Sequence, residues 1–129
     1  MLGTFQQSHL RIEVNASAQS IGESLLYPEK LQQWLFPQQL SSGLPTQLEA
    51  GLTFTTHTGF ITIKHEIETL TDSYLRLILS EGVDGYHEWS WDDGWIQSCL
   101  EGISLLPLNL AQTATLLRLC QFVERETEN

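Results

Sequence analysis

His65 and His87 are the residues of this sequence whose side chains are best suited to proton transfer or to binding a polar group. An imidazole can act as a general acid or base near neutral pH, and it can orient the polar end of a bound molecule. Both fall in alternating segments that predict an inward direction, among Leu, Ile and Trp residues. The alternative is a neutral core histidine hydrogen-bonded to backbone or water, because buried polar groups usually have a partner.

Three tryptophans, Trp34, Trp89 and Trp91, offer large rigid apolar surfaces with one indole donor each. They could line a ligand cavity, or they could fill the same space and leave none, since composition indicates an apolar face but not its volume. In the alternation of the predicted hairpin, Trp95 falls on the opposite face from Trp89 and Trp91. It is predicted to face outward, where it would cover a helix or a partner chain.

The other polar residues do not form a recognisable catalytic set. Asp92 and Asp93 precede a glycine and are explained by turn chemistry. Glu88 and Glu101 are expected to be solvated on the outer face. Ser98 has no inward acid with which to complete a catalytic triad, and no nucleophile-elbow glycines surround it. We therefore predict no catalytic residue with a hydrolase role.

Metal, nucleotide and redox sites are not predicted. Phosphate-loop, dinucleotide-binding and zinc-binding patterns are absent from the sequence. Cys99 and Cys120 lie in apolar surroundings without a CxxC spacing or a neighbouring histidine, so they are predicted to be free buried thiols. The expectation is that the protein uses no cofactor and no metal.

The charge of the chain limits its partners. Six Lys and Arg residues oppose sixteen Asp and Glu residues, which gives a formal net charge of −10. Nucleic acid is not expected as a partner, because phosphate binding depends on clustered Lys and Arg contacts. Anionic membrane surfaces are disfavoured for the same reason. The sequence also contains no apolar run of membrane-spanning length and no signal-peptide pattern, so a cytoplasmic location without membrane insertion is expected.

The elements that must position the histidines begin with one strand and two short helices. The run from His9 to Asn15 alternates polar and apolar residues and predicts a half-buried strand. Asn15 or Ser17 can cap the helix that follows. A second short helix is predicted from Pro28 to Phe36, because proline suits a first helical turn. The stretch from Pro37 to Leu48 is predicted to be a loop.

The first predicted hairpin determines the direction of His65. A two-residue loop of Thr58 and Gly59 would pair Phe54 with Ile63. The resulting inward face contains Leu52, Phe54, Thr56, Ile61, Ile63, His65 and Ile67. A slip of one residue would mix the polar and apolar sets, so their segregation supports this orientation.

The second predicted hairpin determines the direction of His87. Asp93 and Gly94 form the strongest short turn signal in the chain. A two-residue loop at this point directs one set of residues inward: His87, Trp89, Trp91, Ile96, Ser98 and Leu100. The preceding strand, Tyr74 to Leu79, offers Leu75, Leu77 and Leu79 to the same face.

A long helix is predicted from Pro107 to about Glu126. Its first apolar stripe consists of Leu116, Leu119, Cys120 and Val123. A second stripe, on another side of the helix, consists of Leu110, Ala114 and Leu117. Because an ordinary surface helix needs only one stripe, the helix is expected to be gripped by the sheet on one side and to cover something else with the other. A helix of about 20 residues spans roughly 30 Å, enough to cross a small sheet.

This order of elements resembles the START-like (SRPBCC) superfamily, which includes the birch-pollen-allergen fold, polyketide cyclases and the co-chaperone activator domain. The segment LRIEVNASAQSIGESLLYPEKLQQW is similar to the opening strand, helix pair and Trp of that superfamily, here Trp34. The segment WSWDDGWIQSCLEGISLLP is similar to the last hairpin and the start of the terminal helix in small bacterial members.

The resemblance implies an α+β helix-grip fold, in which a curved antiparallel sheet of about six strands surrounds the long C-terminal helix. A single domain over residues 1–129 is expected. Members of this superfamily hold apolar molecules between sheet and helix, but they share no catalytic motif. Fold analogy alone is weak support for a function.

Three functions are therefore considered. The first is binding of a small hydrophobic ligand, lipid-, polyketide- or isoprenoid-like, under the terminal helix. The alternatives are a cyclase- or dehydrase-type enzyme in which an inward histidine moves a proton, and a protein-interaction module or homodimer that uses Phe60, Trp95 or the second helical stripe. The residues predicted to contact a ligand are Trp34, Phe54, Ile63, His65, Leu77, His87, Trp89, Trp91 and Leu117.

Overall fold

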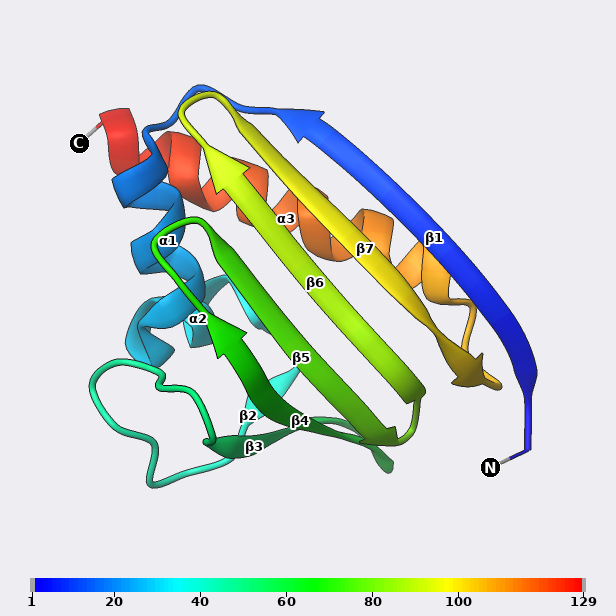
Figure 1. Cartoon of the computed structure of the whole chain (residues 1–129). Helices are drawn as coiled ribbons and strands as arrows, with labels where there is room; N and C mark the ends of the chain where they lie inside the picture. Colours follow the sequence, from blue (N-terminus) through cyan, green and yellow to red (C-terminus); the bar gives the residue numbers. More distant parts are fainter. Residues whose placement is uncertain (1, 129) are drawn as a thin grey trace.

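A curved antiparallel sheet wraps around the C-terminal helix, which crosses its concave face (Figure 1). The computed structural model describes residues 2–128, which form one sheet of seven strands in the order β1-β7-β6-β5-β4-β3-β2, and three helices. The strands are β1 (Thr4–Glu13), β2 (Gln39–Leu40), β3 (Thr53–Thr58), β4 (Ile61–Leu70), β5 (Tyr74–Glu81), β6 (Asp84–Asp92) and β7 (Trp95–Ser104), and the helices are α1 (Ala18–Leu26), α2 (Pro28–Leu35) and α3 (Leu108–Glu128). This arrangement confirms the predicted fold class.

The sheet has one strand more than the predicted six. The additional strand is β2, which lies in the stretch expected to be a loop and pairs Leu40 with Thr56. The side chain of Gln32 in α2 holds it in place, since Gln32 Oε1 accepts a hydrogen bond of 2.7 Å from the Leu40 backbone amide. Two residues are too few to show an alternating pattern, so periodicity could not reveal this strand.

Helix α1 is capped by Ser17, one of the two residues considered for this role. Ser17 Oγ accepts a hydrogen bond of 3.1 Å from the amide of Ser20, as an N-cap side chain does. The first amide of the helix, that of Ala18, donates to Asp93 Oδ1 at 2.7 Å. The turn between β6 and β7 is therefore joined to the start of α1.

The β3–β4 hairpin differs in register from the prediction. Phe54 pairs with His65 rather than with Ile63, and the two-residue loop is Gly59 and Phe60. Gly59 takes the first loop position with a φ of 62°, a conformation that glycine adopts at low cost. Because the shift is two residues, each side chain keeps its predicted face, and Phe60 is left 98% exposed at the tip.

The β6–β7 hairpin has the predicted loop at Asp93 and Gly94. His87 pairs with Leu100, Trp89 with Ser98, and Trp91 with Ile96. The tryptophans, Ile96, Ser98 and Leu100 are buried against the helices. The predicted inward face of this hairpin is confirmed.

The two halves of α3 are attached to the rest of the fold by different interactions. The second half packs apolar side chains into the core, among them Leu119 and Val123. The first two turns bury one apolar side chain, Leu108, and are otherwise held by hydrogen bonds: Asn109 Nδ2 donates to Ser8 Oγ at 2.7 Å, and the Leu108 amide donates to Gln6 Oε1 at 3.0 Å. None of the helices within residues 2–128 combines the length and the apolarity needed to cross a bilayer.

The second apolar stripe of α3 does not cover another element. Leu110 is 68% exposed and Leu117 is 50% exposed. The expectation for this stripe was therefore wrong, because the helix touches the sheet and the short helices with a single continuous face that includes a polar residue, Gln112. The thiols of Cys99 and Cys120 are free, as predicted, but half-buried rather than buried.

Candidate functional site

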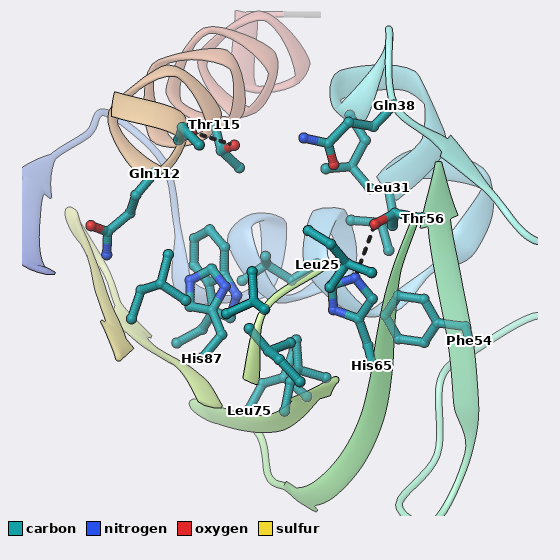
Figure 2. Close-up of a pocket in the computed structure, with 18 of the residues that line it drawn as sticks. Leu25, Leu31, Gln38, Phe54, Thr56, His65, Leu75, His87, Gln112 and Thr115 are labelled. Atoms are coloured by element: carbon teal, nitrogen blue, oxygen red, sulfur yellow. Dashed lines mark hydrogen bonds between the residues drawn. The ribbon is translucent and has the colours of Figure 1, made fainter. Parts of the chain in front are cut away.

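A cavity of about 130 Å³ lies between the inner face of the sheet, the two short helices and α3 (Figure 2). Most of its wall consists of leucine and aromatic side chains. The polar residues that line it are Gln38, Thr56, His65, His87, Gln112 and Thr115. Asp, Glu, Lys and Arg do not occur in this lining as far as the described residues define it. The wall is therefore apolar with a few uncharged polar groups.

Most of the residues predicted to contact a ligand are in the wall of this cavity. They are Trp34, Phe54, Ile63, His65, Leu77, His87 and Trp89. Trp91 lies outside the wall and is 1% exposed, packed against Gly22 of α1, where a Cβ would come within 3.2 Å of the indole nitrogen. Leu117 also lies outside, half exposed on the far side of α3. The placement of these two residues corrects the sequence-based expectation.

Trp34 and Trp89 form one side of the wall without filling the space. Trp34 Nε1 donates a hydrogen bond of 2.8 Å to the carbonyl of Ser24, which fixes the indole of α2 against α1. Its ring meets that of Trp89 edge to face, with centroids 6.4 Å apart and an interplanar angle of 75°. Such a pair is a favourable aromatic geometry. Of the two possibilities considered for the three tryptophans, lining a cavity holds for Trp34 and Trp89, whereas Trp91 fills the core beside α1.

His65 stands on β4 with one ring nitrogen bonded and the other free. Nε2 lies 3.0 Å from Thr56 Oγ1 on β3, and the ring stacks on Phe54 with centroids 4.7 Å apart. Nδ1 is buried and has no hydrogen-bond partner among residues 2–128. Burial lowers the pKa of His65 to about 4, because the charged form loses its hydration. The ring is uncharged at neutral pH.

His87 stands on β6, on the opposite side of the cavity floor (Figure 2). A hydrogen bond of 2.6 Å joins its Nε2 to Ser98 Oγ on β7. The ring tilts against Trp89, with centroids 4.6 Å apart. Burial lowers the pKa of His87 to about 3, and the charge that His65 would carry if protonated adds to the effect. Each histidine thus has a hydroxyl partner, as a core histidine would, and also faces the cavity.

Gln112 is the site residue that the sequence analysis missed. It is 2% exposed and reaches from α3 to the sheet, where its Nε2 donates to Ser8 O at 3.0 Å and to Ser98 Oγ at 2.9 Å. A signal was present in the sequence, since Gln112 lies four residues before Leu116 and continues its buried stripe. A polar residue at an apolar position of a helix indicates a buried hydrogen-bonding role.

The outer face of the sheet carries ion pairs rather than a second site. Arg76 pairs with Glu68 and Glu88, at 3.2 and 3.0 Å. A hydrogen bond to Glu101 raises the pKa of Tyr86 to about 12. Trp95 faces outward as predicted, but Arg11 covers its ring at 4.0 Å from the centroid. A cluster of His, Cys, Asp or Glu suited to holding a metal ion is not found in the described part of the chain.

Comparison with known proteins gives matches to solved structures only, because no family model and no curated protein matches the chain. Protein CV1439 from Chromobacterium violaceum has 17% identity and a TM-score of 0.72, over 92% of this chain and 97% of that chain. The Aha1 dimer from Colwellia psychrerythraea has 13% identity and a TM-score of 0.69, over 92% and 96%.

A third match is DynU16, a protein from the dynemicin biosynthetic locus. It has 16% identity and a TM-score of 0.69, and the match covers 92% of this chain but 47% of DynU16. The chain therefore spans about half of the length of that protein. Identities this low show a shared fold and do not carry a function. Together with the strand order and the helix that crosses the concave face, these matches show that the chain has the helix-grip fold that its resemblance to the START-like superfamily predicted.

Proposed function

We propose that residues 1–129 form a single domain that binds a small uncharged apolar molecule in the cavity between the sheet and α3. The observation that carries this proposal is the cavity itself, since protein interiors are normally packed without voids larger than a water molecule. At about 24 cal/mol per Å³, an empty cavity of 130 Å³ would cost the fold about 3 kcal/mol. A ligand that restores the missing contacts would recover much of that cost.

The size of the cavity limits the ligand. An apolar cavity of about 150 Å³ holds a benzene molecule, which has six non-hydrogen atoms, so 130 Å³ has room for a molecule of about that size. A whole lipid, polyketide or isoprenoid, the classes expected from the resemblance, exceeds this volume. The proposal is therefore a ring-sized molecule, or one end of a longer chain. Gln38, which follows α2, and Thr115 of α3 lie on opposite sides of the top of the cavity (Figure 2).

The enzyme alternative has less support from the geometry. A general base is most effective when its pKa is near the working pH. The pKa values of His65 and His87 are lowered to about 4 and about 3, which leaves both rings weakly basic at neutral pH. A carboxylate partner for either ring is not present in the cavity wall within the described residues. The cytoplasmic location predicted from the sequence stays a prediction.

Filling the cavity is expected to abolish binding. Leu77 lies on the cavity floor between the strands that carry the histidines, so Leu77→Phe places a ring in the space available to a ligand. Benzene at ten times its Kd should stabilise the unmodified protein by about 1.4 kcal/mol, measured as a rise in Tm, and Leu77→Phe should show no such rise.

Leu117→Phe is the matched control, because it makes the same change on the exposed side of α3. It should keep the benzene-dependent rise in Tm. An equal rise in all three proteins would mean that benzene binds elsewhere, and no rise in the unmodified protein would contradict the proposal.

Self-association is a second candidate function, and a specific surface feature favours it. Leu2, Phe60 and Leu105 are 83%, 98% and 77% exposed, and all three border one hollow near the tip of the β3–β4 hairpin. Exposed apolar side chains gathered in this way are typical of contact surfaces. We expect the mean mass in light scattering to rise above 14.6 kDa with concentration. Phe60→Lys should reduce that rise, and a mass constant at the monomer value would contradict the proposal.

A further inference from the structure

Gln112 is held in one orientation by the sheet. Its Nε2 lies 3.0 Å from the carbonyl oxygens of both Ser8 and Ser98, and carbonyl oxygens can only accept hydrogen bonds. A flipped amide would place Oε1 against these two oxygens. The N–H groups therefore face the sheet, even though Oε1 is left buried without a partner among the residues described. The third neighbour of Nε2 is Ser98 Oγ, at 2.9 Å, so the two N–H groups are shared among three acceptors, two of which belong to Ser98.

The orientation of Gln112 determines where the proton of Ser98 lies. Ser98 is fully buried, and its Oγ faces Gln112 Nε2, which carries only donors and therefore cannot accept the serine proton. Its own proton can then be donated to His87 Nε2, which lies 2.6 Å away. The reverse arrangement, with Nε2–H donating to Ser98, would leave the serine proton buried without an acceptor, which is costly. The hydrogen bonds thus run from Gln112 to Ser98 and from Ser98 to His87.

The tautomer of His87 follows from this chain. A neutral imidazole carries one proton, and a Nε2 that accepts a hydrogen bond leaves that proton on Nδ1. Nδ1 makes no hydrogen bond to any described residue, and it is not among the polar atoms sealed from solvent. The ring lines the cavity. His87 therefore presents an unused N–H donor to a space whose surrounding wall is mostly apolar.

We infer that the cavity selects uncharged molecules that carry a hydrogen-bond acceptor, such as a ketone oxygen, and that His87 Nδ1–H is the donor that recognises it. This inference rests on the proposed function, because it specifies the ligand of the same cavity. Ser98 and Gln112 are positioning residues, since they act on the ligand only through the tautomer of His87.

The rest of the wall excludes charged alternatives. Within the described chain the lining contains no Lys or Arg to neutralise a carboxylate and no Asp or Glu to neutralise an amine. A charged ligand would lose its hydration without gaining a partner. Burial also keeps His87 itself neutral, since its pKa is lowered to about 3, so the donor is present throughout the physiological range. A pure hydrocarbon fits the wall but leaves the N–H of His87 without an acceptor.

Two probes of the same shape test the inference. Cyclohexanone and methylenecyclohexane each have seven non-hydrogen atoms. Cyclohexanone carries an acceptor oxygen at the position where methylenecyclohexane carries a CH₂ group. Their Kd values are measured by ligand-observed NMR with the unmodified protein and with His87→Phe, which keeps a flat ring but removes the donor. We expect His87→Phe to weaken cyclohexanone binding about tenfold or more and to leave methylenecyclohexane binding equal or tighter. Cyclohexylammonium, which also has seven non-hydrogen atoms but is charged, should not bind the unmodified protein.

A measurement without ligand tests the positioning residues. Long-range ¹H–¹⁵N correlation spectra of the unmodified protein should show His87 protonated on Nδ1 only. Ser98→Ala removes the donor to Nε2, so the spectrum should show both tautomers, and cyclohexanone binding should weaken by less than in His87→Phe. This readout does not depend on His87→Phe being able to fold.

The outcomes separate the inference from the proposed function. If both probes bind and the ratio of their Kd values is the same in His87→Phe as in the unmodified protein, the inference is wrong while the cavity still binds ligands. The inference is also wrong if the spectra show His87 protonated on Nε2. If neither probe binds the unmodified protein, the proposed function fails and the inference fails with it.

Discussion

Lowering the pH from 7.5 to 5.0 should reduce the free energy of unfolding by about 4 kcal/mol through His65 and His87 alone. Both pKa values are lowered in the folded state, to about 4 and about 3, from an ordinary value of 6.5. Protons then bind the unfolded chain preferentially, so the stability is complete above pH 6.5 and falls as the pH drops below it. At pH 5.0 the loss is about 2 kcal/mol for each histidine, since one pKa unit corresponds to 1.36 kcal/mol.

Urea unfolding at a series of pH values would measure this loss. His65→Gln removes one of the two groups and should lower the difference between pH 7.5 and 5.0 by about 2 kcal/mol. His57→Gln is the control, because His57 is exposed on the other face of the sheet, where it contacts Thr55 and Thr62. The same pH dependence in all three proteins would show that the buried histidines are not its source.

Gly85→Ala should destabilise the protein by more than about 3 kcal/mol. Gly85 pairs with Gly102 near the start of β6, and a Cβ on Gly85 would lie 1.9 Å from the carbonyl oxygen of Glu101 in β7. Overpacking a core typically costs 1–3 kcal/mol when side chains can move aside. Here the obstacle is backbone, so the two strands would have to separate and break their ladder of hydrogen bonds.

Thermal unfolding followed by far-ultraviolet circular dichroism would measure this effect. Ser90→Ala, on the same strand but on its outer face, is the control and should change the free energy of unfolding by no more than about 0.5 kcal/mol. A Tm of Gly85→Ala close to that of Ser90→Ala would mean that the strands can open at this point without cost.

Turn chemistry and alternation predicted most of the sheet, and the one register error shows their limit. Asp93 and Gly94 occupy the loop that their types favour, so the pairing of His87 and its neighbours was correct. At the other hairpin Gly59 fits either position of a two-residue loop, and the alternative places an exposed phenylalanine, Phe60, at the tip. Local sequence preferences do not distinguish these two registers. Both registers direct each side chain to the same face of the sheet, so alternation does not distinguish them either.

The sequence predicted the site residues that lie on strands, because strand side chains alternate between the two faces of the sheet. It did not predict which face of α3 is buried. His65, His87 and Trp89 point inward because strand residues alternate. Leu117 was placed wrongly because two apolar stripes on α3 compete, and only the packed structure decides which one is buried. Gln112 lies on the buried stripe because hydrogen bonds to Ser8 and Ser98 compensate for its burial, and such long-range partners are not visible in a single helical pattern.

Because its first two turns bury only one apolar side chain, that of Leu108, α3 need not leave the sheet as a unit. Hydrogen bonds such as those of Gln6 and Asn109 contribute only about 1 kcal/mol each, since water replaces them when they break. The buried side chains of Leu119, Phe122 and Val123 anchor the other half far more strongly. The first turns can therefore detach as a partial opening while the sheet and the remaining turns stay folded. If a guest molecule enters and leaves by this route, the detachment rate sets a lower limit on its residence time, to which its own affinity adds.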